Sequence, residues 1–127
     1  MFKTLKTWRS ARRARPLAEL LAVDFDESTV RVRVLAEFGS AWNQECRWDE
    51  ITRVCFRDGG LRRSDEILLD VRGRSKPVLV LTEAAGGPAF VAAIGQRGLF
   101  PPELFAQFIG STAGNAYCWP PSDARGG

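Results

Sequence analysis

Histidine is absent from the 127-residue sequence, and its absence removes most of the common catalytic devices. Without an imidazole, the chain cannot build a serine–histidine triad, a histidine metal site or a histidine pH switch. The remaining candidates for chemistry are thiols and carboxylates. The three cysteines are Cys46, Cys55 and Cys118, and none stands in a C-x-x-C or other zinc-type spacing.

The cysteines all fall in stretches with strand-like alternation, where cysteine commonly packs as a small apolar residue. A cysteine nucleophile needs a depressed pKa and a neighbouring base, and no histidine is present to supply one. Any single intramolecular disulfide would leave one thiol unpaired. We therefore expect packed cysteines in a reducing, cytoplasmic protein with no catalytic residue, no cofactor and no metal site.

Two acidic pairs and one glycine pair are the other candidates for chemistry. Neighbouring carboxylates on a strand point to opposite faces, so Asp49–Glu50 and Asp65–Glu66 do not converge on one site. Gly86-Gly87-Pro88 precedes a helix-like stretch, as phosphate-binding loops do. It lacks G-x-G-x-x-G and a Walker lysine, and Glu83 is nearby, so we predict a turn. The protein is not expected to be an enzyme.

The positive charge is concentrated at the N-terminus. The net charge is +3, yet six of the 18 bases and none of the 15 acids lie in residues 1–15, which leaves residues 16–127 mildly acidic. A basic arm on an acidic body does not fit a nucleic-acid-binding face. The arm is either a loose or docked extension or a surface for an anionic membrane or an acidic partner. Its candidate binding residues are Phe2, Lys3, Lys6, Trp8, Arg9, Arg12 and Arg13.

The composition and the hydrophobic pattern predict one domain. Hydrophobic residues make up 45% of the chain and charged residues 26%, which is typical of a soluble globular protein. No apolar stretch approaches the roughly 18 residues of a membrane span, and no secretory leader is recognisable. We expect a basic arm over 1–15, a single domain over 16–119 and a flexible tail over 120–127.

Period-two alternation begins at Leu20 and predicts an antiparallel meander. Trp42 and Trp48 share a strand face, which indicates a substantial core. The expected strand 77–82 is apolar throughout, which predicts that both of its faces are buried. Helical spacing then places Phe90, Ala93, Ile94 and Arg97 on one face, and a second helix is expected to bury Leu104, Phe105, Phe108 and Ile109. The expected strands are 20–25, 30–38, 42–48, 51–56, 66–71 and 77–82, with a short extended piece over 115–119.

The junction Trp48-Asp49-Glu50-Ile51-x-x-Val54 resembles one found in the pleckstrin-homology-like fold of small bacterial proteins. The stretch from Gly98-Leu99-Phe100 through Gly110-Ser111-Thr112, Asn115 and Cys118-Trp119 also resembles the C-terminal part of short bacterial proteins of unassigned function. The resemblance covers about residues 20–119. It implies an α+β domain in which an antiparallel, partly rolled six- to seven-strand sheet is closed by C-terminal helices.

Phosphoinositide-binding pleckstrin domains grip phosphates with basic residues on their first two strands. Arg31 and Arg33 match the second-strand part of that pattern. Asp24, Asp26 and Glu27 occupy the first strand and its loop, where they would repel a phosphate. We therefore expect both arginines to be solvated and paired with acids.

The charged loop from Asp58 to Asp65 is the most exposed feature predicted inside the domain, and such loops often carry binding sites on β scaffolds. We predict a protein-binding site at Arg57, Arg62, Arg63 and Asp65. The predicted function is a noncatalytic, cytoplasmic protein-binding module, with an immunity-type protein that blocks a toxin as one version. The alternative is a peripheral membrane adaptor whose arm binds anionic lipid, each base near the surface contributing about 1 kcal/mol.

Overall fold

The computed structural model describes residues 17–34, 43–59, 64–110 and 115–121. The basic arm, Trp42, Arg62 and Arg63 lie outside these residues, as does most of the tail. The described residues form an α+β domain, as expected. The elements are η1 (Leu17–Glu19), β1 (Leu21–Phe25), β2 (Thr29–Val34), β3 (Gln44–Arg47), η4 (Trp48–Glu50), β4 (Ile51–Arg57), β5 (Glu66–Val71), β6 (Val78–Leu81), α2 (Gly87–Gln96), α3 (Pro102–Ile109) and β7 (Ala116–Trp119).

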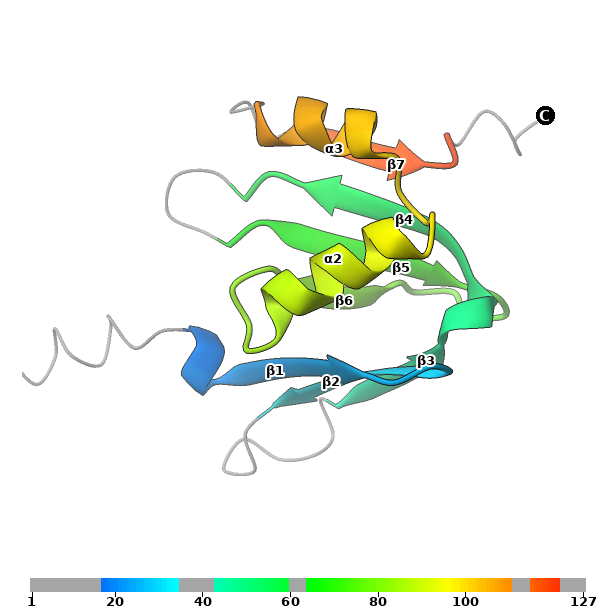
Figure 1. Cartoon of the computed structure of the whole chain (residues 1–127). Coiled ribbons are helices and arrows are strands. Elements are labelled where there is room, and N and C mark those ends of the chain that lie inside the picture. The colour runs from blue at the N-terminus through cyan, green and yellow to red at the C-terminus, as the bar shows by residue number, and fades with distance from the viewer. Residues whose placement is uncertain (1–16, 35–42, 60–63, 111–114, 122–127) are drawn as a thin grey trace, which may run out of the picture.

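The strands form two antiparallel sheets and not the single six- to seven-strand sheet that the sequence led us to expect. One sheet has the order β1-β2-β3 and the other has the order β6-β5-β4-β7. The chain passes between them at η4, where a 3₁₀ turn replaces the continuous strand. Trp48 fixes this turn because its side chain is buried and its indole N–H donates to the carbonyl oxygen of Asp26 at 2.8 Å. Figure 1 shows α2 in front of the sheets and α3 beside β7.

The segment before α2 ties the two sheets together. Ala85 accepts a hydrogen bond from the N–H of Val23 at 2.8 Å and donates one to the carbonyl of Leu21 at 2.9 Å, so it extends the β1 edge. Gly86 follows with φ = 82°, and a Cβ there would lie 2.2 Å from the carbonyl oxygen of Val23. A Cβ on Gly87 would lie 2.1 Å from the carbonyl oxygen of Thr82. The glycine pair is therefore explained by the close approach of these backbones: Gly86 is a turn residue, as predicted, while Gly87 and Pro88 already begin α2.

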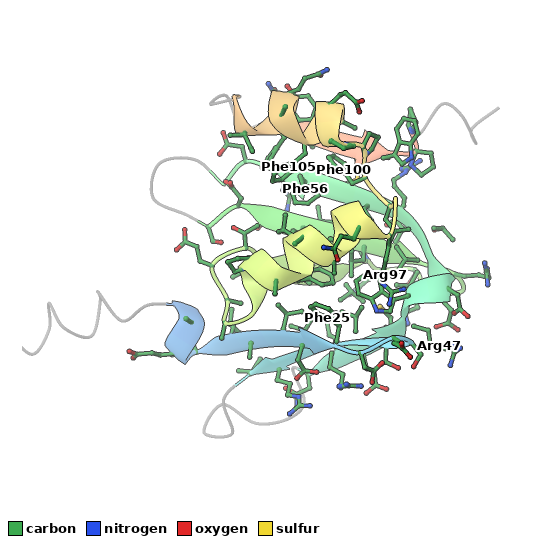
Figure 2. All side chains as sticks on the ribbon, in the orientation of Figure 1. Phe25, Arg47, Phe56, Arg97, Phe100 and Phe105 are labelled. Atoms are coloured by element: carbon green, nitrogen blue, oxygen red, sulfur yellow. A yellow bond between two sulfur atoms is a disulfide. The ribbon has the colours of Figure 1, made fainter. Side chains whose placement is uncertain are left out.

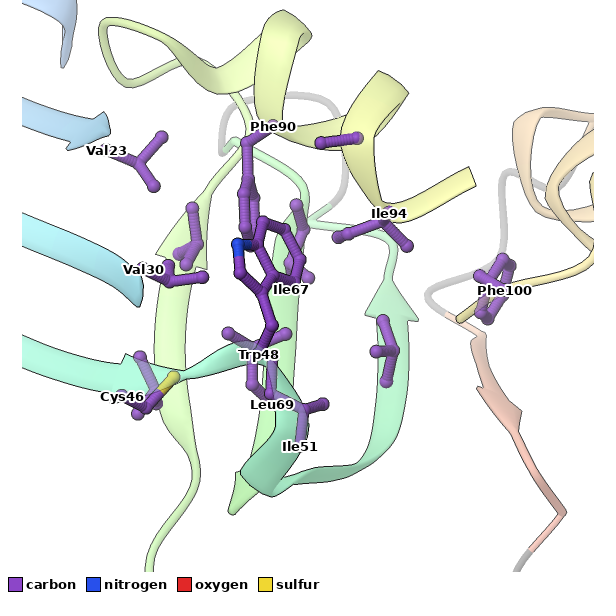
Figure 3. Close-up of a cluster of buried hydrophobic side chains, with 14 of the residues drawn as sticks. Val23, Val30, Cys46, Trp48, Ile51, Ile67, Leu69, Phe90, Ile94 and Phe100 are labelled. Atoms are coloured by element: carbon purple, nitrogen blue, oxygen red, sulfur yellow. The ribbon is translucent and has the colours of Figure 1, made fainter. Parts of the chain in front are cut away.

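The core fills the space enclosed by the two sheets and α2. Phe90 of α2 is fully buried, and its ring contacts Trp48 at 5.6 Å and Phe25 at 6.0 Å between centroids. Figure 3 shows Val23 and Val30 from the first sheet and Ile67 and Leu69 from the second around the rings of Phe90 and Trp48. The alternation seen in the sequence therefore points inward from both sheets.

Two expectations about burial are wrong. Val78 and Val80 of β6 are buried, but Leu79 is 36% exposed, because β6 is the outermost strand of its sheet and only one of its faces is covered. In α3, Phe108 is buried while Ile109 is 64% exposed at the last residue of the helix. The apolar face of α3 is thus wider than the part of the helix that packs against the rest of the domain.

The cysteines do not all pack as free thiols, which corrects the sequence-based expectation. Cys46 does so, since it is buried and its burial raises the pKa of its thiol. Cys55 of β4 and Cys118 of β7 stand directly opposite each other in the strand register and form a disulfide. They are 63 residues apart in the sequence, so their pairing depends on β7 returning to the free edge of β4.

None of the helices in the described ranges has the length and apolar character needed to cross a membrane.

Candidate functional site

A groove of about 380 Å³ lies between α2 and α3 and is the best candidate for a binding site. Its floor is Phe56 of β4, and its walls include Val91 of α2 and Phe105 and Ile109 of α3. Figure 2 shows Phe56 and Phe105 close together beneath α3. The groove is therefore an apolar surface that two helices hold open above the four-stranded sheet.

The floor of the groove is held by a cluster of aromatic rings. The ring of Phe56 lies 4.6 Å from that of Phe100, 5.2 Å from that of Phe105 and 5.4 Å from that of Phe108. Phe108 also meets Tyr117 of β7 edge to face at 6.2 Å. Ring pairs at these separations add to the stability given by burial alone. The wall formed by α3 is thus supported from both β4 and β7.

Two carboxylates stand at one end of the groove, where β4 ends and β5 begins. Asp58 follows β4, and its N–H donates to the carbonyl of Asn115 at 3.1 Å. The Asp65 carboxylate accepts the N–H of Gly59 at 3.0 Å, and the Asp65 carbonyl accepts the N–H of Thr82 at 3.0 Å. The backbones of Asp58 and Asp65 are therefore held in place by hydrogen bonds with neighbouring segments.

The described segments around the groove carry more acids than bases. From residue 82 to residue 110 the chain carries the acids Glu83 and Glu103 and the single base Arg97. Arg97 is engaged at the far end of α2, where its guanidinium lies over the Trp48 ring, 4.1 Å from the centroid. Among the residues that the structure describes, the lining of the groove therefore combines an apolar floor with the acids Asp58 and Asp65, which favours an apolar ligand that also carries positive charge.

The residues predicted to bind a partner are only partly brought together. Asp65 lines the groove. Arg57 points to the opposite face of the sheet from its neighbour Phe56, where its Nε donates to Oε1 of Glu66 at 2.6 Å. Arg62 and Arg63 lie outside the described residues. The predicted cluster is thus divided between two sides of the sheet.

The apolar part of the groove was not predicted from the sequence. Phe105 and Ile109 were assigned to the core because they share the apolar face of α3. Val91 was not singled out. The signal that could have revealed the groove is the width of that apolar face, because a helix at the edge of a small sheet cannot bury all of it.

A second pocket of about 270 Å³ lies beside Trp48, and both of its arginines are engaged by groups of the same chain. Arg97 donates to the carbonyl of Glu27 at 2.9 Å, and Nε of Arg47 donates to the Asp49 carboxylate at 3.2 Å. Both arginines are labelled in Figure 2. The Arg97 contact holds the end of α2 against the β1–β2 turn, and the Arg47 contact is local to the η4 turn, so we assign this pocket a structural role.

The arginines of β2 are also paired, as the sequence predicted. Nε of Arg31 donates to the Asp24 carboxylate at 2.9 Å, and Nη2 of Arg33 lies 3.2 Å from the other oxygen of that carboxylate. Both side chains are therefore engaged by an acid that would also repel a phosphate.

Asp26 at the β1–β2 turn predicts a specific pH dependence of stability. Its Oδ1 accepts the N–H groups of Ser28 and Thr29, and Arg31 donates to its Oδ2; these bonds hold the pKa of Asp26 well below its usual range. A depressed pKa in the folded state stabilises the fold above the unfolded-state pKa, and that stabilisation is lost as the pH falls through the folded-state pKa. Asp26→Asn keeps an acceptor for the two N–H groups but carries no charge.

We therefore expect Asp26→Asn to be less stable than the wild type near neutral pH and to lose less stability on acidification. Urea unfolding midpoints measured near pH 7 and near pH 3 check this, since an unperturbed aspartate titrates near pH 4. The same drop in midpoint for both proteins would show that the hydrogen-bonded charge of Asp26 does not contribute.

Comparison of the chain with protein-family models, with curated proteins and with solved structures found no match. In the parts of the chain that the structure describes, no group of three or more cysteine, aspartate or glutamate side chains is placed to hold a metal ion.

Proposed function

We propose that this protein is a noncatalytic protein-binding module whose groove between α2 and α3 binds an apolar, basic segment of another protein. The observation that carries the proposal is the exposed Ile109 beside the phenylalanine floor of the groove. A large aliphatic side chain that is 64% exposed beside a concave apolar surface is typical of a recognition site. Covering both would remove apolar surface from water, which is the main driving force of association.

The rim of the groove supports the basic character of the proposed partner. Asp58 and Asp65 line one end, and the described residues that line the groove include no lysine or arginine. A lysine or arginine of the partner would meet the Asp65 carboxylate, which accepts the N–H of Gly59 and has room for further donors, as its apolar neighbours enter the groove. Such complementarity mainly increases specificity and the rate of association.

An immunity-type protein that blocks a toxin is one version of this function. A module of this kind acts by covering a surface and needs no reacting group of its own. The acidic rim would suit a toxin with a basic surface. Identification of the bound protein decides between this version and an adaptor that links two cellular proteins.

We also propose that the two sheets are the halves of a pleckstrin-homology-like roll. In support, β1-β2-β3 and β4-β5-β6 are consecutive antiparallel meanders, and α2 follows β6. The expected cytoplasmic location belongs to the same proposal. Disulfides persist mainly in oxidising compartments, so the thiol state of Cys55 and Cys118 in the native cell tests that location.

Replacing Ile109 by aspartate is expected to reduce capture of the partner from a native lysate by at least about tenfold, because it places a charge in the apolar contact. The measurement is quantitative mass spectrometry of proteins retained by the immobilised full-length chain. Ala106→Asp is the matched control, since Ala106 is exposed on the same helix and does not line the groove. Equal capture by the wild type and Ile109→Asp would contradict the proposal.

The same capture experiment separates this function from the membrane alternative. A chain over residues 16–127 lacks the six bases of the arm but keeps the groove, so we expect it to retain the partner. The alternative predicts instead that the full chain sediments with anionic vesicles and that removal of the arm abolishes this sedimentation. Lipid binding without a retained protein partner would favour the peripheral membrane adaptor.

A further inference from the structure

The outer face of the four-stranded sheet is a second surface, separate from the groove. Figure 1 shows the helices on one side of this sheet. On β5 the side chains of Ile67, Leu69 and Val71 are buried toward the helices. The alternate residues of β5, which are Glu66, Leu68 and Asp70, therefore point to the outer face.

The strand register arranges the outer face in rows that cross all four strands. The central row is apolar, with Leu79 of β6, Leu68 of β5 and then Cys55 of β4 joined to Cys118 of β7. Leu79 is 36% exposed, and the other members of the row are partly exposed. This row is therefore a stripe of apolar surface that no described element covers fully.

A charged row runs beside the apolar row, with its acid on β5 and its base on β4. Glu66 and Arg57 are register partners joined by an ion pair, and their side chains are 27% and 49% exposed, respectively. On the other side of the apolar row, Asp70 of β5 stands opposite Arg53 of β4, so the acid is again on β5 and the base on β4. Arg53 is mostly buried, with a side-chain exposure of 10%, whereas Asp70 is 44% exposed, so Arg57, Asp70 and Glu66 carry the exposed charge of this face.

This order of charges is self-complementary about one particular symmetry axis. Consider a twofold axis that is parallel to the strands and lies above the boundary between β4 and β5. It places β4 of one copy over β5 of the other, with each residue at the same position along the strand direction. Glu66 then faces Arg57 of the second copy, and Leu68 faces the disulfide at Cys55. A twofold axis across the strands would instead bring Arg57 toward Arg53 of the second copy, and the repulsion of like charges disfavours it.

We propose that a second copy of this chain packs on the outer face of the four-stranded sheet through this twofold axis, as a reversible homodimer. Two sheets packed face to face lie about 10 Å apart with their strands nearly aligned. Strand spacings of about 4.8 Å and rises of about 3.4 Å per residue give the face a plan area of roughly 300 Å². This area is small beside the roughly 800 Å² per partner of a standard interface, which is why the dimer is reversible.

Sedimentation velocity of the full, disulfide-intact chain over a concentration series tests the dimer. We expect a monomer–dimer equilibrium in the range of roughly tens of micromolar, shifted toward the monomer by salt because the ion pairs are half-exposed. Ile109→Asp is expected to dimerise like the wild type, since its position is on the helical side. A wild type that stays monomeric up to the solubility limit would overturn the proposal.

Two charge reversals test the symmetry itself. Arg57→Glu and Glu66→Arg each place like charges opposite one another across the twofold axis, so each variant alone is expected to dimerise at least about tenfold more weakly. In an equimolar mixture, the introduced base of one chain faces the introduced acid of the other, and the dimer is expected to return. A mixture that remains monomeric, or single variants that dimerise normally, would overturn the proposal.

Circular dichroism shows whether the two variants are folded, since each also loses the ion pair within its own chain. If either is unfolded, Leu79→Lys provides the test at an exposed position on the edge strand. It places a charge in the apolar row and is expected to weaken the dimer by at least about tenfold. Unchanged dimerisation of Leu79→Lys would equally overturn the proposal.

Discussion

Replacing both Cys55 and Cys118 with alanine is expected to lower the free energy of unfolding by about 4 kcal/mol. The disulfide closes a loop with a sequence separation of 63 residues, so its loss releases much conformational freedom in the unfolded chain. Urea unfolding of the double variant and of the wild type measures the difference. The wild type in excess dithiol reductant is the matched control and should lose a similar amount.

Loss of this disulfide should lower the local stability of β7 more than that of the other strands. In the described residues, β7 pairs only with β4, and its inner side supports α3 through the contact of Tyr117 with Phe108. Hydrogen exchange of β7 and α3 is therefore expected to accelerate more than that of β5. A change in stability below about 1 kcal/mol would show that the strand pairing holds β7 without the covalent link.

Phe90→Ala is expected to destabilise the domain by about 3–5 kcal/mol. Phe90 is fully buried on α2, and its ring touches Trp48 and Phe25, which belong to the η4 turn and to β1. Its removal leaves a cavity at the point where α2 meets both of these segments. Since whole domains are stabilised by only about 5–15 kcal/mol, this variant should lose a large fraction of its free energy of unfolding.

Thermal and urea unfolding followed by circular dichroism check the effect of Phe90→Ala. Phe90→Leu is the control, because it keeps most of the apolar volume and should cost less than about 1.5 kcal/mol. A loss below about 1 kcal/mol for the alanine variant would mean that α2 is not essential to the core.

The strands themselves were predictable because each shows its inward face as an alternation in the sequence. The predicted strand 66–71 has the same bounds as β5, where Ile67, Leu69 and Val71 alternate with polar or less buried residues. The division into two sheets was not predictable in this way. Alternation reports which face of a strand is buried but not which strands pair, and Asp49–Glu50 could be recognised only as an interruption.

The disulfide and the groove depend on contacts between segments that are distant in the sequence. Cys118 reaches Cys55 only because β7 pairs with the free edge of β4 after two helices have intervened. Asp65 and Arg57 were grouped because they flank one loop, yet alternation along β4 turns Arg57 to the other face of the sheet. The exposure of Ile109 likewise follows from where α3 ends on the sheet, which its sequence does not reveal.

Photo-crosslinking from position 109 tests the proposed groove most directly. With benzoylphenylalanine in place of Ile109 in the full chain, we predict a crosslink in native cells to a protein segment that combines apolar residues with lysine or arginine. The same probe in place of Ala106, which is exposed on α3 outside the groove, should not give this product. Equal crosslinking from both positions, or crosslinks from position 109 to lipid alone, would contradict the groove as a protein-binding site.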